Sequence, residues 1–477
     1  MKTEEQLAAF VCGTSYRDLP PEVVAIAKDQ ILAALGGVIA GAYAAGCETV
    51  ASMAKEAGGS PEATILVHGG KVPVQQAAFV NAVMARALDI CDSAAPGPHP
   101  GSAVIPAALA AAELVGGVRD AHSVSGGHSV SGAGHVSGAD FLAAVCIGTE
   151  VALRFNLGEA EYDGFDPTGV CVPFGAAAAV AKILSLSEPE VLNALALAFC
   201  RCGGSFQANV DGALAVRVVQ GWVAETGVVC ARLAARGITG PANFLEGVYG
   251  YPHLFGRDRD TDARRARAAS IVSALGTHYH AGKLVFKRFP SCGATQAGTQ
   301  LALDLMAAEG LDAGDVEHIQ ITVPPYVYRL VGHPFHIGDN PKVNAQFSIR
   351  YCVANALIRK TPVLAHFEEA AIRDPEVLRL VERIDVVGDA ALDARGHTAV
   401  DMRLRTKDSR EFARGRDIAP GFPQSPLTRE QHLSRFRDCV EFAGRPGVAE
   451  KADAVIAAIA GLDEARDVSG LVRLLVE

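Results

Sequence analysis

The chain has 477 residues, of which 49% are hydrophobic and 20% charged, and its formal net charge is -10. One hydrophobic core rarely serves this length, so two domains are expected. The acidic balance argues against a nucleic-acid partner or a membrane surface, but not against a small anionic substrate. The eleven cysteines are scattered without a paired framework, and the first residues lack the order of a secretory signal. We therefore expect free thiols and a cytoplasmic protein.

The first half of the chain is expected to be a series of helices, because apolar residues recur at intervals of three and four. These helices are predicted at 4–12, 21–42, 74–88, 104–115, 139–154, 174–186, 189–200 and 214–236, with one short strand at 64–68. The apolar run 31–46 is short for a membrane span and is interpreted as the buried half of the helix that begins near Pro21.

The pattern changes after about residue 283, where alternating segments indicate strands. Strands are predicted at 318–323, 383–387, 400–405 and 411–416, with helices at 296–309 and 345–359 and final helices at 429–443, 448–461 and 468–476. The predicted fold class is mainly α with an inserted α+β domain. A large helical domain would comprise residues 1–280, a smaller α+β lid domain residues 281–417, and C-terminal helices in 418–477 would complete the helical domain.

Two segments interrupt this plan. Residues 122–138 repeat the pattern His-Ser-Val-Ser-Gly, and their flexible Gly/Ser spacing favours a surface loop over a metal site. Residues 257–267 are dense in Arg and Asp and are interpreted as a solvated connection between helices.

The segment 87–102 carries the most chemistry. It places Asp89, Asp92, Ser93 and His99 on a Pro/Gly-rich loop directly after an apolar helix. An Asp and a His that converge on one pocket supply a base and an acid near neutral pH. The alternative is that Asp92 and Ser93 cap a turn while His99 is merely exposed.

Several blocks in this sequence resemble the MmgE/PrpD family, which includes 2-methylcitrate dehydratase, cis-aconitate decarboxylase and iminodisuccinate epimerase. They occur in family order over nearly the whole chain, at 3–41, 77–81, 87–106, 136–154, 166–179, 237–240, 286–292 and 345–351. The resemblance implies a helical domain with a smaller α+β lid domain, a homodimer, and no metal or organic cofactor. It also implies a lyase, either dehydratase or decarboxylase, that moves a proton at the carbon next to a carboxylate of a di- or tricarboxylate.

The resemblance also suggests roles for individual residues. The family's Asp and Ser/Thr pair matches Asp89 and Ser93, its loop histidine matches His99, and its lysine at the start of the lid domain matches Lys287. By this resemblance, Asp89 orients His99 or accepts a proton, and His99 exchanges a proton with the substrate. Ser93 would donate a hydrogen bond to a substrate carboxylate, and Lys287 would neutralise developing charge.

The sequence departs from the family pattern at four positions. Cys91 stands where an aspartate is frequent, Asp166 and Gln296 where histidines are common, and Val216 where a lysine is expected, although Arg217 lies beside it. The loss of a histidine and a lysine and the gain of Asp166 make the expected pocket less positive. Asp166 is predicted either to touch the substrate or to cap the following helix.

A tricarboxylate substrate would need other cations. Either Arg217, Arg288 and Arg350 compensate, or the substrate carries fewer negative charges. Cys292 is a further candidate for substrate contact, although it is more typical of a packed thiol because no histidine partner is evident. Two other functions stay open: an epimerase or isomerase that uses the same proton chemistry, and a binding protein that has lost the reaction.

Overall fold

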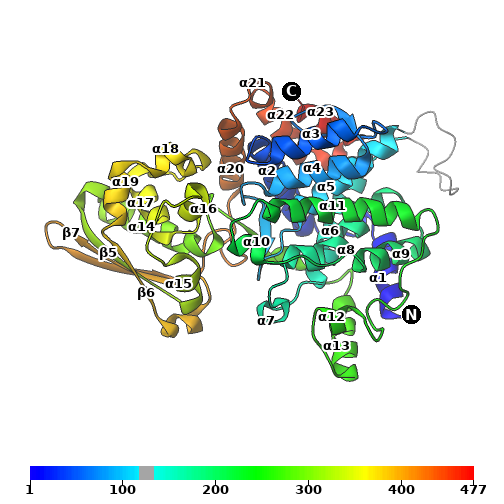
Figure 1. Cartoon of the computed structure of the whole chain (residues 1–477), viewed down its shortest axis with the longest axis horizontal. Helices are drawn as coiled ribbons and strands as arrows, with labels where there is room; N and C mark the ends of the chain where they lie inside the picture. Colours follow the sequence, from blue (N-terminus) through cyan, green and yellow to red (C-terminus); the bar gives the residue numbers. More distant parts are fainter. Residues whose placement is uncertain (118–133, 477) are drawn as a thin grey trace. The chain divides into compact units, whose positions relative to one another are not determined.

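The computed structural model describes residues 1–117 and 134–476 and divides into two compact units (Figure 1). The helical unit comprises Met1–Leu284 and Cys439–Glu477, and the mixed unit comprises Val285–Asp438. As predicted, the chain is mostly helical and has a small mixed sheet towards its C-terminal part. The histidines at 122 and 128 of the predicted repeat loop lie outside the described residues.

The helical unit is built around tightly packed helices. Its longer helices are α1 (Thr3–Gly13), α2 (Pro21–Gly41), α3 (Cys47–Ala57), α4 (Val74–Arg86), α5 (Gly101–Gly117), α6 (Gly138–Arg154), α8 (Pro167–Ile183), α9 (Glu188–Phe199), α11 (Ala215–Ala234), α13 (Thr261–Val272) and α22 (Ala452–Ala460). Its short helices are α7 (Glu159–Tyr162), α10 (Gln207–Val210), α12 (Tyr251–Leu254), α21 (Pro446–Ala449) and α23 (Ser469–Leu474).

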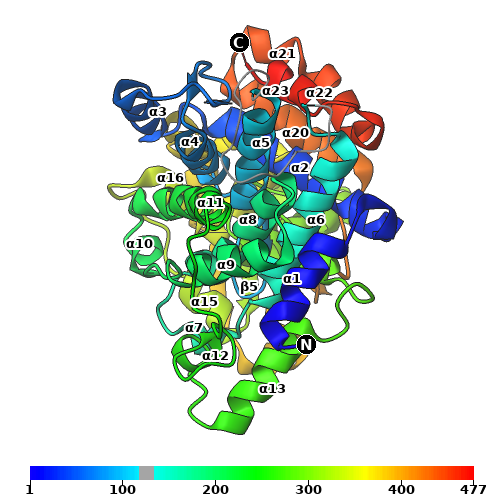
Figure 2. The ribbon, with the colours of Figure 1, turned by 90° about the vertical axis from the view of Figure 1, so that its right-hand side faces the viewer.

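Small residues let α6 and α8 cross closely at the centre of this unit. A Cβ added to Gly148 would lie 2.7 Å from the Gly175 carbonyl oxygen, so neither position tolerates a side chain. The helices α22 and α23, from the far end of the chain, pack beside α2 and α5 (Figure 2). By length and composition α2 could cross a membrane, but most of its residues are buried within the helical unit, as in the core helix of a globular domain.

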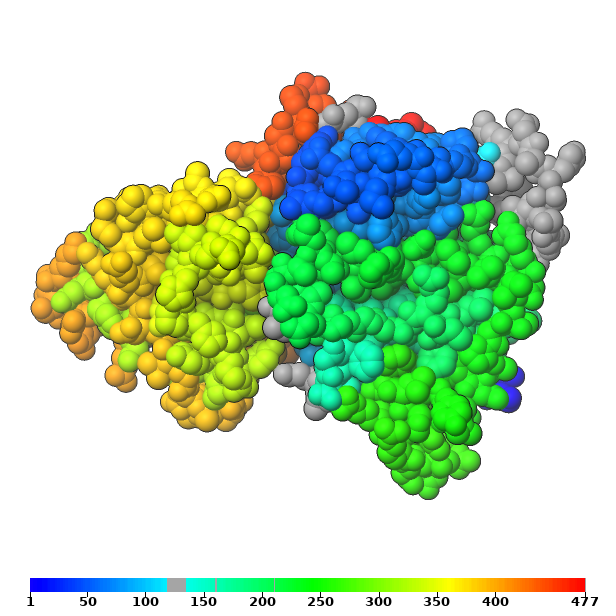
Figure 3. Space-filling view, viewed as in Figure 1, coloured from blue at the N-terminus to red at the C-terminus, as the bar shows by residue number. Residues whose placement is uncertain are grey.

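Several local predictions for the helical unit differ from the structure. The predicted strand at 64–68 is only β1 (Ala63–Thr64), paired antiparallel with β2 (Lys71–Val72). The predicted solvated connection contains the start of α13, because the Asp260 carboxylate accepts hydrogen bonds from two backbone N–H groups and caps a helix there. This part of the unit protrudes at the lower edge in Figure 3.

The mixed unit contains the four-stranded sheet that the alternating segments predict. Its strands are β5 (Val316–Val323), β6 (Ile384–Gly388), β7 (Val400–Thr406) and β8 (Glu411–Arg416), in the order β6-β5-β7-β8. The β5–β6 pair is parallel, and the other pairs are antiparallel. The helices of this unit are α14 (Gln296–Glu309), α15 (Pro325–Val331), α16 (Pro341–Gln346), α17 (Ile349–Arg359), α18 (Glu369–Ile372) and α19 (Pro375–Val381). The last helix, α20 (Arg429–Ala443), begins in the mixed unit.

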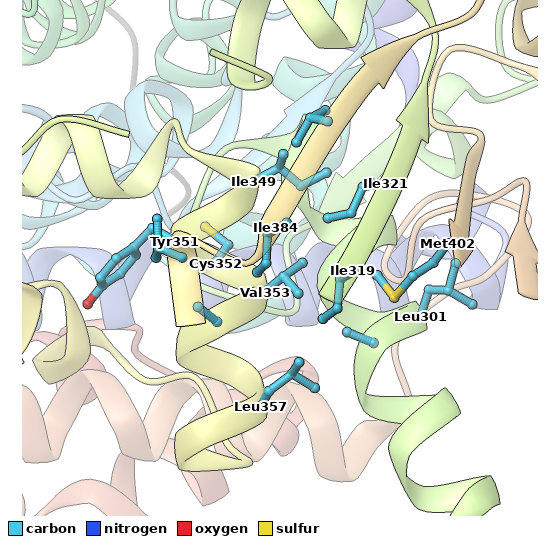
Figure 4. Close-up of a cluster of buried hydrophobic side chains, with 14 of the residues drawn as sticks. Leu301, Ile319, Ile321, Ile349, Tyr351, Cys352, Val353, Leu357, Ile384 and Met402 are labelled. Carbon is cyan, nitrogen blue, oxygen red and sulfur yellow. The ribbon is translucent and has the colours of Figure 1, made fainter. Parts of the chain in front are cut away.

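The core of the mixed unit lies between the sheet and the helices α14 and α17 (Figure 4). Ile319 and Ile321 of β5 point towards Leu301 of α14 and Val353 of α17, and all four are buried. The predicted helix at 345–359 is instead two helices, because Ser348 leaves helical geometry and its hydroxyl accepts a hydrogen bond from the Tyr351 N–H. Covering one face of a sheet with helices in this way gives the alternating burial of β5.

Candidate functional site

The loop between α4 and α5 carries the predicted site residues of the helical unit. Helix α4 ends at Arg86, and Asp89 then adopts a φ of 56°, in the left-handed region that few residues other than glycine enter. The chain continues through β3 (Asp92–Ala94), where Ser93 is half-buried. Backbone strain of this kind is concentrated at functional sites.

The His99 side chain is held in one orientation. Its Nδ1 lies 2.8 Å from the Asp92 carbonyl oxygen and 3.4 Å from the Cys91 Sγ. Because a carbonyl only accepts hydrogen bonds, we assign the ring proton of the neutral form to Nδ1. The other nitrogen, Nε2, then lies 3.8 Å from the Asp89 Oδ1. The expectation that His99 is merely exposed is wrong, since the residue is buried.

The backbone of His99 is fixed by Ser102, three residues along the chain, and by two residues from distant parts of the helical unit. The Thr168 hydroxyl accepts from the His99 N–H at 3.1 Å, and the His99 carbonyl accepts from the Gln220 amide at 2.8 Å and from the Ser102 hydroxyl at 3.2 Å. Thr168 and Gln220 were not predicted as site residues. Their contacts with the loop cross helices that are distant in sequence, so no local pattern could reveal them.

Asp92 secures the loop rather than facing a reactant. It is fully buried, and its Oδ2 accepts from the Gln30 amide at 2.7 Å and from the Gly101 N–H at 3.0 Å. The Gln30 amide is oriented in turn by the Thr149 hydroxyl at 3.0 Å. Asp92 thus binds the start of α5, nine residues later, which differs from the local turn cap of the alternative prediction.

Arg86 is the neighbour of Asp89 that the sequence prediction missed. Its Nη1 lies 2.6 Å from the Asp89 Oδ1, and its side chain is 10% exposed. Burial alone would lower the pKa of Arg86, but the negative charges of Asp89 and Asp166 among its neighbours leave the pKa above its ordinary value. Arg86 and Asp89 are three residues apart, but the helix ends at Arg86, so helical spacing does not pair their side chains and no pattern in the sequence indicated the contact.

The structure places Asp166 at the N-terminus of α8 as a helix cap. Its Oδ1 accepts from the Thr168 N–H at 2.8 Å and from the Gly169 N–H at 3.2 Å, while Oδ2 lies 3.4 Å from the Asn209 amide nitrogen. Of the two predicted roles, helix capping is the one that the contacts show. This cap also explains why α8 begins at Pro167, well before the predicted residue 174.

The candidate cation Arg217 lies at the start of α11. Its Nη1 donates to the Ala45 carbonyl at 2.7 Å. Burial and the nearby charge of Arg86 lower the pKa of Arg217, and contact with Cys47 only partly opposes this effect. Arg217 is therefore close enough to Arg86 for their charges to interact, but its guanidinium already binds the loop after α2.

The remaining candidates belong to the mixed unit. Lys287 and Cys292 are buried, and Arg288 donates to the Gln300 side chain at 2.6 Å. Arg350 donates to the carbonyls of Ile384 at 2.9 Å and His333 at 2.7 Å, so its guanidinium serves the backbone of its own unit. All eleven cysteines are free thiols, and among residues 1–117 and 134–476 no three His, Cys, Asp or Glu side chains gather as metal ligands would.

Comparison with known proteins bears on this arrangement. The MmgE/PrpD N-terminal domain model matches residues 5–264, and the MmgE/PrpD C-terminal domain model matches residues 289–460. The chain belongs to the MmgE/PrpD family. It is 23% identical to the cis-aconitate decarboxylase of Homo sapiens, over 99% of this chain and 94% of that one. It is also 23% identical to the Mus musculus enzyme, over 99% and 93%, and 22% identical to a cis-aconitate decarboxylase-like protein of Aspergillus oryzae, over 98% and 96%.

Two departures from the family pattern have a structural role in this chain. Asp166 and Gln296 stand where the resemblance expects histidines, and both side chains bind the backbone. Asp166 caps α8, and the Gln296 side chain accepts from the Phe289 N–H at 2.9 Å and donates to the Phe289 carbonyl at 3.0 Å. At both positions, a side chain that exchanges protons near neutral pH is replaced by one that orders a loop.

Proposed function

We propose that the protein is a lyase that acts at the carbon next to a carboxylate of a di- or tricarboxylate, with decarboxylation of cis-aconitate as the first reaction to test. The observation that carries this proposal is the fixed His99 ring, with Nδ1 bound to a carbonyl and Nε2 beside the Asp89 carboxylate. The curated relatives matched over nearly their whole length, named cis-aconitate decarboxylases, support the same class of reaction.

In this mechanism His99 delivers the proton. Loss of carbon dioxide breaks a carbon–carbon bond and leaves its electron pair on the substrate as a carbanion or enolate. The protonated Nε2 then donates its proton to that carbon, and solvent restores the ring. The carboxylate of Asp89 stabilises the protonated ring by electrostatic attraction at 3.8 Å. A positioned acid of this kind contributes about 10²–10⁴-fold to the rate.

Two further residues take roles from their family positions. Ser93 would donate a hydrogen bond to a substrate carboxylate, and Lys287 would neutralise the charge that develops in the transition state. We also propose a homodimer. Leu214, Trp222 and Leu233 on or next to α11 are 48%, 50% and 38% exposed, which suits burial by a second copy of the chain. Light scattering of the purified protein tests this, and a monomeric mass would contradict it.

The activity is tested by proton NMR in deuterated water with cis-aconitate, 2-methylcitrate and smaller dicarboxylates. A decarboxylase gives a product that has lost one carboxylate and carries deuterium at the protonated carbon, whereas a dehydratase gives a new alkene. Either product supports the proposed lyase. Deuterium in an unchanged carbon skeleton would instead identify an epimerase or isomerase, and no change with any substrate would contradict the proposed reaction.

A further inference from the structure

The guanidinium of Arg86 is the feature of the helical unit that the proposed mechanism does not use. We infer that Arg86 binds a carboxylate group of the substrate and so anchors it beside His99. This inference rests on the proposed function for the identity of the substrate, but not for the binding step. We thus assign to Arg86 the charge-compensating role for which the sequence offered Arg217, Arg288 and Arg350.

Arg86 has unused hydrogen-bonding capacity in a confined place. A guanidinium carries five N–H donors. Among the described residues, the structure gives this group one side-chain partner, the carboxylate of Asp89 at 2.6 Å. The side chain is 10% exposed, so bulk water reaches it only in part. A shielded cation in this state is stabilised by a second anion, and a carboxylate matches the fork of an arginine with two parallel hydrogen bonds.

The position of Arg86 suits a substrate anchor. One Asp89 oxygen lies 2.6 Å from the guanidinium and 3.8 Å from the His99 Nε2. The same oxygen thus links Arg86 to the nitrogen that exchanges the proton, so a group held by Arg86 is in the neighbourhood of that nitrogen. Asp89 in turn fixes Arg86, because its left-handed backbone turns the carboxylate back towards the last turn of α4.

The local charges favour one substrate carboxylate at this point. Arg86 interacts with the carboxylates of Asp89 and Asp166, and the positive charge of Arg217 lies close enough to act on Arg86. The charges of these four residues of the helical unit sum to zero. Arg217 spends its guanidinium on the Ala45 carbonyl. Of these two arginines, Arg86 is therefore the one with hydrogen-bond donors left for a substrate carboxylate, and further substrate carboxylates would need other cations.

Binding measurements on the intact protein test this inference. Calorimetry and thermal shift are run with cis-aconitate, succinate and the neutral diamide of succinate on the wild type, Arg86→Gln and Arg86→Lys. We expect cis-aconitate and succinate to bind to the wild type. The Arg86→Gln substitution should weaken that binding about tenfold or more. Arg86→Lys keeps the charge without the fork and should fall between the two. The affinity for the neutral diamide should be the same in all three proteins.

The matched control is Arg232→Gln. Arg232 lies on α11 of the same unit and pairs with Glu62 at 3.1 Å, so this variant also removes one half-buried arginine–carboxylate pair. It should bind both carboxylates as the wild type does. Equal affinity of the wild type and Arg86→Gln for the carboxylates, or no carboxylate binding by the wild type, would overturn the inference. Should Arg86→Gln fail to fold, Arg86→Lys decides it by the same comparison.

An Asp89→Asn background distinguishes a direct contact between Arg86 and the ligand from an indirect effect of Arg86 through Asp89. If Arg86 touches the ligand, then Arg86→Gln still weakens carboxylate binding in that background. If Arg86 acts only by holding Asp89, the second substitution changes nothing and the inference fails. The proposed function is judged separately: carboxylate binding that needs Arg86, without turnover, removes the lyase and keeps the anchor. Turnover with an unchanged KM in Arg86→Lys and Arg86→Gln removes the anchor and keeps the lyase.

Discussion

The loop at 87–100 and the sheet core of the mixed unit are both buried, yet they are stabilised differently. In the sheet core, apolar side chains such as Ile319 and Ile321 pack against two helices (Figure 4). In the loop, buried polar groups are bound one by one, for example Asp92 by Gln30 and the His99 carbonyl by Gln220. In the sheet core, one apolar side chain can replace another of similar volume. Each polar side chain around the loop must instead keep its hydrogen-bond geometry.

The largest effect on kcat is expected in the loop, at His99. His99→Asn should lower kcat by about 10²–10⁴-fold, because the proton-exchanging nitrogen is lost. The fold should persist, since Thr168 and Gln220 bind the backbone of residue 99 and not its ring. Kinetics and circular dichroism measure both. His318→Asn changes a half-buried histidine of the sheet that pairs with Asp385 and should leave kcat unchanged. Full activity of His99→Asn would rule out the proposed proton transfer.

Lys287 extends the comparison to a buried cation of the mixed unit. Lys287→Ala should lower kcat by about 10²–10³-fold if this ammonium group stabilises the transition state. Lys283→Ala removes an exposed lysine four residues earlier and is the matched control. A change in KM alone would show instead that Lys287 contributes only to substrate binding.

The third prediction removes a polar partner of the loop. Gln30→Leu leaves the Asp92 carboxylate without the hydrogen bond at 2.7 Å, which should cost about 1–3 kcal/mol in the free energy of unfolding. Activity should fall as well, because the Asp92 carbonyl orients the His99 ring. Denaturant titration and kinetics check both effects. Gln6→Leu, at a glutamine whose amide donates to the Met1 carbonyl, should change neither. A stable, fully active Gln30→Leu would contradict the role of this contact.

A matched substitution in the sheet core should affect stability alone. Ile321→Val removes one buried methylene group and should cost about 0.5–1.5 kcal/mol of unfolding free energy. The kcat of the folded protein should not change, because no polar contact is altered. Denaturant titration and kinetics at low temperature measure the two quantities. A large loss of kcat would show that the core of the mixed unit also controls the reaction.

The same contrast explains what could be predicted from the sequence. Periodicity predicted the four strands of the sheet and most helices, because apolar burial repeats with the backbone geometry. It also placed Asp89 and His99 on one loop. It missed Gln30, Thr168 and Gln220, whose contacts join residues 62, 69 and 121 positions apart in the chain. No local pattern records such distances.

Arg86 and α13 were missed for different reasons. An arginine in the last turn of a helix is ordinary, because it favours the helix dipole, so Arg86 did not stand out until its pairing with Asp89 was seen. For α13, the density of charge hid a helix start, since Asp260 reads as a solvated residue unless its capping role is considered.

The last predicted effect is a pH dependence of stability in the mixed unit, which is confined to acidic pH. Burial, aided by the charge of Arg359, lowers the pKa of His366 to about 4, and its Nδ1 accepts a hydrogen bond from the Val363 N–H. In the unfolded chain the pKa of a histidine is about 6.5, so the unfolded state binds the proton first as the pH falls. This contribution to stability is therefore complete above pH of about 6.5 and is lost as the pH falls towards about 4.

His366→Gln should reduce the decrease in Tm over that range, whereas His318→Gln should not. An unchanged pH dependence in His366→Gln would mean that the decrease comes from other groups.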